Sequence, residues 1–140
     1  MGIAILYPVF GQIILTFALM IGMGLTRKEA LDNREVTVDD IALDHSRWPA
    51  RPRKFANCYV NQFELPVIFY VLCLMALMTR NGDLIMVVLA WIFVATRLVH
   101  AYIHITANVV LRRGGAFFAG FIVVAIMTVL MLVRLLFPAI

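Results

Sequence analysis

The chain has 140 residues, of which 64% are hydrophobic, and its mean hydropathy is +0.96. This apolar fraction is larger than one small soluble core can bury, so the composition excludes an ordinary soluble domain and predicts an integral membrane protein. The formal net charge is +4; we attribute it to membrane topology, and nothing in the chain suggests nucleic-acid binding.

Four apolar blocks are long enough to cross about 30 Å of hydrocarbon as helices that rise about 1.5 Å per residue. They cover residues 4–25, 58–79, 84–107 and 116–137. The first lacks a basic start and a small-residue cleavage site, so we expect a retained helix rather than a removable signal peptide. The fold class predicted is all-α: an integral membrane four-helix bundle forming one domain over residues 1–140.

The first connection, residues 26–57, is polar and contains two prolines, which predicts a loop with room for one short surface helix. Its acidic half, residues 32–44, precedes a basic half, residues 47–54. Trp48 in that basic half suggests an anchor at the membrane interface. The cations beside it then face lipid headgroups or an anionic ligand, or they reflect membrane orientation alone.

Lys and Arg are concentrated in the first and third connections. Because cytoplasmic loops are enriched in Lys and Arg, both connections are predicted to be cytoplasmic and both termini non-cytoplasmic. In the second connection, residues 80–83, Asn-Gly predicts a tight turn, so the helices on either side should be antiparallel neighbours. Cys58 and Cys73 lie about 22 Å apart on one predicted helix, too far for a disulfide, and we expect Cys58 to be a buried filler.

Polar residues form one stripe on each of two neighbouring spans, where hydrocarbon disfavours them strongly. The stripe on the second helix consists of Asn57, Asn61 and Glu64. The stripe on the third helix consists of Arg97, His100, His104 and Asn108. Their spacings place each set on one helix face.

Counting residues inward from the helix ends places the two stripes at similar depth. Asn61 should be level with His104, and Arg97 lies deeper, where Glu64 is the natural partner for its charge. The stripes form either a ligand site for a zwitterionic, polyanionic small molecule or a purely structural ladder within the bundle or between copies. A metal held by the two histidines is disfavoured, because Arg97 repels cations. A transporter has little support, because no span shows a break.

The string Asn61-Gln62-Phe63-Glu64-Leu65-Pro66-Val67-Ile68-Phe69 resembles the N-x-x-E…P…F signature of the MAPEG family, membrane-associated proteins in eicosanoid and glutathione metabolism. Arg97-Leu98-Val99-His100 is similar to the matching Arg-containing segment of that family. Chain length, span number and loop order resemble the family over nearly the whole chain.

The resemblance implies a homotrimer, of bacterial type and in the bacterial inner membrane, that binds glutathione between subunits at the cytoplasmic mouth. The ligand-binding residues it suggests are Asn57, Asn61, Glu64, Arg97, His100 and His104. It further implies that Arg113 or Arg112 stabilises the thiolate as the catalytic group, and that the second substrate is a lipophilic electrophile arriving from membrane lipid.

The chain differs from glutathione-using members at two of these positions. Asn57 stands where they carry Arg, and His104 stands where they carry Tyr. Two functions are therefore predicted: a glutathione-dependent transferase or peroxidase, or a non-catalytic scaffold or lipid-binding subunit that keeps the family fold.

Overall fold

The computed structural model describes residues 2–137; residue 1 and residues 138–140 of the domain predicted over 1–140 lie outside this range. Four helical segments are long and apolar enough to cross a membrane: Gly2–Asp32, Ala50–Met78, Leu84–Ile105 and Val110–Leu136. No strand occurs among the described residues. The prediction of an all-α, four-helix membrane fold is confirmed.

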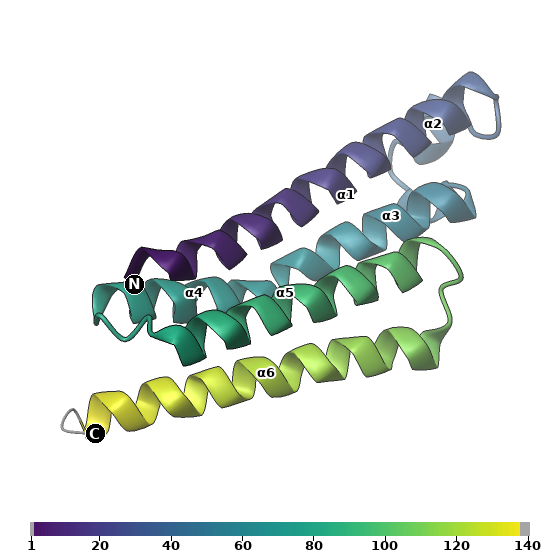
Figure 1. Ribbon diagram of the computed structural model, residues 1–140. Helices are drawn as coiled ribbons and strands as arrows, with labels where there is room; N and C mark the ends of the chain where they lie inside the picture. Colours follow the sequence, from purple (N-terminus) through teal and green to yellow (C-terminus); the bar gives the residue numbers. More distant parts are fainter. Residues whose placement is uncertain (1, 138–140) are drawn as a thin grey trace.

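The elements follow one another as an up-and-down bundle (Figure 1). In chain order they are η1 (Gly2–Ile5), α1 (Leu6–Asp32), α2 (Val38–Ile41), η2 (His45–Arg47), α3 (Ala50–Val60), η3 (Asn61–Phe63), α4 (Leu65–Met78), α5 (Leu84–Ile105) and α6 (Val110–Leu136). We call the end that carries α2 and the α5–α6 connection the loop end. The opposite end, which carries η1 and the α4–α5 turn, is the terminal end.

The helices are longer than the apolar blocks, so the loop expected over residues 26–57 shrinks to residues 33–49. In α1 the extension is held by polar contacts. The Thr26 hydroxyl donates to the Gly22 carbonyl oxygen at 2.8 Å, and Lys28 pairs with Asp32 at 2.5 Å one turn later. Hydropathy identifies only the part of a helix that suits hydrocarbon. Contacts within the helix stabilise its extension beyond the hydrocarbon region.

The second span is broken, which the sequence reading missed when it took every span as continuous. α3 ends at Val60, a 3-10 turn follows, and Glu64 has non-helical dihedral angles (φ −98°, ψ −106°) before α4 begins. Pro66 explains the break: it has no N–H to donate to the Gln62 carbonyl, and its ring would clash with that carbonyl in a continuous helix. The break falls within the predicted polar stripe.

The α4–α5 turn differs from the predicted Asn-Gly turn. Arg80 adopts the left-handed conformation (φ 60°), and the N–H groups of Arg80 and Asn81 donate to the carbonyl oxygens of Leu77 and Ala76. This is a Schellman ending of α4. Gly82 has a different role, because a Cβ there would lie 3.3 Å from the Gly2 carbonyl oxygen, so the turn can pack against the start of the chain.

The main core lies in the terminal half of the bundle, where α4, α5 and α6 meet. The rings of Phe69 and Phe93 stack there with centroids 4.4 Å apart, which confirms α4 and α5 as neighbours. Gly120 lets α6 approach this stack closely, since an added Cβ would lie 2.9 Å from the Thr96 hydroxyl. The two cysteines are buried and free, as expected.

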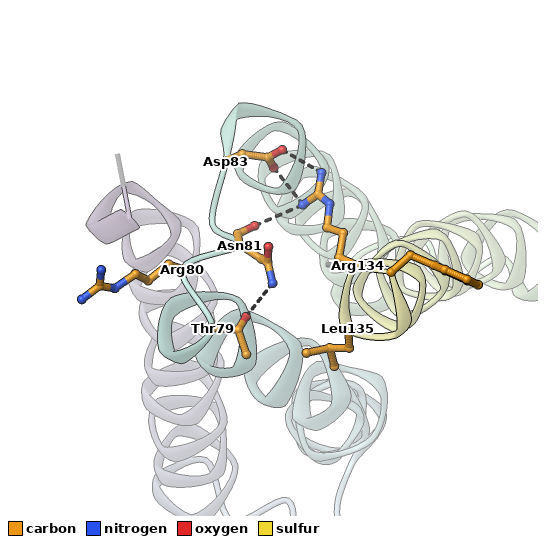
Figure 2. A pocket seen from close by; sticks show the side chains of 7 residues that line it. Thr79, Arg80, Asn81, Asp83, Arg134 and Leu135 are labelled. Carbon is orange, nitrogen blue, oxygen red and sulfur yellow. Dashed lines mark hydrogen bonds and ion pairs between the residues drawn. The ribbon is translucent and has the colours of Figure 1, made fainter. Parts of the chain in front are cut away.

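An ion pair closes the terminal end of the bundle (Figure 2). Arg134 near the end of α6 donates to both carboxylate oxygens of Asp83, at 3.2 and 2.7 Å, and to the Asn81 carbonyl oxygen at 3.2 Å. Asp83 also caps α5 by accepting from the Met86 N–H. Burial acts to raise the pKa of the Asp83 carboxyl, but the hydrogen bonds from Met86 and Arg134 and the positive charge lower that pKa overall.

Gly120→Ala should destabilise the bundle, because the Thr96 hydroxyl that blocks the new methyl group is held by its hydrogen bond to the Phe93 carbonyl oxygen. Overpacking of this kind costs about 1–3 kcal/mol. The measurement is the melting temperature in detergent. Gly115→Ala is the matched control on the same helix, since no atom lies within 4 Å of its added Cβ. Equal melting of the two variants contradicts the proposed close contact.

Asp83→Asn should lower the melting temperature at neutral pH by the equivalent of about 1 kcal/mol or less, because the ion pair is partly exposed. The Asn side chain can still accept the hydrogen bond that caps α5, so the variant removes the negative charge and keeps the cap. With its folded-state pKa below the ordinary 3.8, Asp83 contributes stability above pH 3.8 and loses it as the pH falls through the lowered value. The difference from wild type should therefore vanish in acid. Asp39→Asn, on an exposed carboxylate, is the control; a difference that persists in acid contradicts the assignment.

Candidate functional site

The predicted polar stripes meet at the break in the second span. The Nδ2 atom of Asn61 lies 3.4 Å from His100 Nε2 and 3.4 Å from His104 Nδ1. The two imidazole rings are perpendicular, with centroids 5.6 Å apart. One amide group therefore bridges both histidines, at the depth that residue counting assigned to them.

The contacts of His100 determine which ring nitrogen carries the proton. His100 Nδ1 lies 3.1 Å from the Arg113 carbonyl oxygen, which can only accept, so Nδ1 is the donor. The Nε2 atom is then free to accept from the Asn61 amide. This arrangement suits a neutral ring and ties α3, α5 and the first turn of α6 together.

Arg97 is fully buried, yet none of its three guanidinium nitrogens has a hydrogen-bond partner among residues 2–137. Its guanidinium carbon lies 5.4 Å from the centre of the Phe117 ring, a cation–π contact. The pairing with Glu64 predicted within the bundle is absent. The reason is the break before Pro66, which leaves Glu64 exposed on the outside of this chain.

Glu64 and Asn57 both lie on the outer surface, and Asn61 between them is half-buried. A carboxylate exposed at this position of a spanning segment faces either hydrocarbon or another molecule. Hydrocarbon is a costly neighbour for it, so Glu64 is a candidate contact for a ligand or a second protein molecule.

Arg112 and Arg113 lie in a helix, whereas the sequence predicts that they belong to the connection before the fourth span, residues 112–115. The connection covers residues 106–109, and both arginines belong to the first turn of α6. Arg113 is half-buried and donates to the Asn108 side-chain oxygen at 2.7 Å, so it is held beside His100. Arg112 is exposed and has no hydrogen bond or ion pair within the described chain. The geometry therefore connects Arg113, and not Arg112, with the stripe residues.

Sequence reasoning missed a second buried polar group next to the break. Gln12 of α1 donates to the Gln62 side-chain oxygen at 2.9 Å, and Gln62 donates to the Cys58 carbonyl oxygen at 2.8 Å. Both glutamines are buried, and Gln12 Oε1 has no partner among the described residues. The sequence contained a signal for this pair, because a glutamine inside each of two apolar spans is as unusual as the residues of the two polar stripes.

An apolar cavity of about 280 Å³ lies between α1 and the broken span. Aromatic side chains line much of it, among them Phe17, Tyr59, Phe63 and Tyr70. Tyr59 and Phe63, whose rings pack edge to face at 5.1 Å, flank Asn61 in the sequence. The cavity and the stripe that contains Asn61 therefore share the broken span, and the described lining of the cavity includes none of the stripe residues. Only the tertiary structure could reveal it, since its lining comes from two distant segments.

Metal ligands do not gather at this site. Within residues 2–137, no group of three His, Cys, Asp or Glu side chains is arranged to hold an ion. Asn61 and the Arg113 carbonyl occupy both nitrogens of His100, which leaves that ring no free ligand atom.

Comparison with protein families matches residues 5–133 to the MAPEG family. No curated protein and no solved structure gave a significant match. The family match spans both polar stripes, the broken helix and all four apolar helices. This protein therefore belongs to the MAPEG family.

Proposed function

We propose that this protein is a glutathione-dependent transferase or peroxidase that acts on lipophilic electrophiles in the membrane. The observation that carries the proposal is that two unlike surfaces share one broken span: a polar stripe that includes the exposed Glu64, and an aromatic cavity lined in part by Tyr59 and Phe63. A polar thiol and an apolar second substrate need a polar site and an apolar site in the same region of the protein.

The polar residues suit the charges of a glutathione-type ligand. Glu64 is an unpaired carboxylate that can accept hydrogen bonds from the ligand's amino group. Asn61, with Asn57 one turn before it and the two histidines opposite, offers neutral donors and acceptors. The guanidinium nitrogens of Arg97 have no hydrogen-bond partner among the described residues. A carboxylate of the ligand or of a neighbouring copy would balance the positive charge of this side chain.

Arg113 is the better candidate for the group that stabilises the thiolate, because it is half-buried and fixed by Asn108. A nearby cation favours the thiolate, which is the reactive form of a thiol. In a transfer reaction the sulfur forms a bond to the electrophilic carbon, and the leaving group departs with its electron pair. In the peroxidase reaction the sulfur attacks a peroxide oxygen, the O–O bond breaks, and a second thiol reduces the oxidised sulfur to a disulfide.

We also propose that the working form is a homotrimer in which the exposed side of the stripe faces a neighbouring copy. Glu64 and Asn57 on the outer surface support this, because protein contact or a ligand between copies removes them from hydrocarbon. Mass measurement of the detergent-solubilised protein distinguishes one copy from three.

Glu64→Gln should weaken glutathione binding by about 1–3 kcal/mol, the usual effect of losing a charged hydrogen-bond partner. The measurement is calorimetry on the purified full chain, together with conjugation of a generic aryl electrophile. Glu35→Gln is the matched control, because Glu35 is an exposed carboxylate in the loop between α1 and α2, outside the stripe. Absence of both glutathione binding and conjugation in the wild type overturns the proposal.

The second candidate function is a scaffold or lipid-binding subunit without chemistry. The observation that favours it is that His104 and Asn61 contact each other, where glutathione-using members have a Tyr at the histidine position. Under this function glutathione leaves the melting temperature unchanged, whereas removal of Glu64 or Arg97 lowers it. A thermal-shift series with and without glutathione separates the two functions.

A further inference from the structure

Some of the charged residues at the loop end pair with one another. Arg47 pairs with Asp40 at 2.9 Å and with Asp44 at 3.5 Å, and Arg51 pairs with Glu29 at 2.9 Å. Several other cations of this end have no ion pair with a described residue. Positive charge is concentrated where such unpaired cations lie around one cavity.

Two of the unpaired cations, Arg27 and Arg53, line the same cavity of about 330 Å³. The side chain of neither forms an ion pair or a hydrogen bond with another described residue, and the Nε atom of Arg27 is buried without such a partner. His45, Ser46 and Asn57 add polar atoms to the lining. No acidic side chain lines the cavity among the described residues, so its charge is positive and uncompensated.

Packing holds one side of this cavity in place. The Arg27 guanidinium stacks over the Trp48 ring, 5.1 Å from its centre, and Trp48 is buried against Ala30 and Val36. The stack covers one face of the guanidinium, and Arg27 remains part of the cavity lining. A donor fixed in this way loses little conformational freedom when it binds an anion.

The position along the helix indicates the depth of the cavity. Arg27 follows the last residue of the apolar block, Leu25, so its charge lies where hydrocarbon gives way to headgroups. Tryptophan is enriched at that level of a membrane. The cavity offers two guanidinium groups, an imidazole and an amide. An anion with three or more acceptor oxygens can use these groups more fully than a carboxylate, which has two.

We propose that this cavity binds a phosphate group, carried either by an anionic lipid headgroup or by a soluble phosphate compound. The site lies on the loop side of the stripe and shares Asn57 with it, but its cations, Trp48 and loop residues are separate. The proposal does not depend on glutathione chemistry, and its test contains no thiol.

The test uses the full chain, purified in neutral detergent without phosphate, and follows the melting temperature at constant ionic strength. One titration uses inorganic phosphate, a second uses short-chain phosphatidylglycerol, and phosphatidylcholine of the same chain length is the zwitterionic control. We expect a saturable rise with inorganic phosphate or with phosphatidylglycerol. Saturation by inorganic phosphate assigns a soluble ligand, whereas saturation by the anionic lipid alone assigns the headgroup.

Arg53→Gln should raise the half-saturation concentration about tenfold, the effect of losing one charged hydrogen-bond partner. Arg53 is exposed at the cavity, so its replacement leaves the core intact. Arg27→Gln should have an effect at least as large, but it also disturbs the Trp48 stack, so Arg53→Gln decides the outcome.

Arg34→Gln is the matched control, because Arg34 is exposed, unpaired among the described residues and outside the cavity. It removes the same charge from the same end of the bundle and should leave the half-saturation concentration unchanged. The proposal is overturned if neither ligand gives a saturable rise, or if Arg34→Gln weakens the response as much as Arg53→Gln does.

Discussion

Hydrocarbon provides no hydrogen bonds, so every polar group inside a spanning segment must find its partner within the protein or in a bound molecule. The architecture of this chain follows from that constraint at one place, the break in the second span. Pro66 interrupts the helix, Gln62 turns inward to Gln12 and to the Cys58 carbonyl, and Asn61 bridges two histidines. Most freed polar groups are thereby satisfied.

Some are not satisfied. Among the described residues Arg97 is buried without a partner and Glu64 is exposed without one, although the sequence suggested that they would pair. One residue belongs to each stripe, and the aromatic cavity lies on the same broken span as Glu64. Unsatisfied charge and an apolar cavity on one span are the observations behind our proposal of a site that joins a polar ligand to a lipophilic one.

Charged groups at the loop end, outside the hydrocarbon, also either pair within the protein or remain available to a bound molecule. Some opposite charges of the loop pair with one another, and two of the unpaired cations, Arg27 and Arg53, line one cavity beside Trp48. At the terminal end Arg134 is committed to Asp83, whereas Arg80 points away from the turn network (Figure 2). The two ends of the bundle thus differ: an ion pair closes one, and a cavity with two unpaired cations and no acidic side chain among its described lining residues lies at the other.

The fold class, the four spans and the depth at which Asn61 meets the histidines could be predicted from the sequence, because hydropathy and helix geometry depend on local order alone. It also carried the resemblance that the family match confirms. Which polar groups pair depends on the tertiary structure. The helix is interrupted at Glu64 and the Glu64 side chain is exposed, so the pairing with Arg97 predicted from a straight helix does not form. Gln12 with Gln62, and both cavities, likewise depend on contacts between distant segments that no local pattern records.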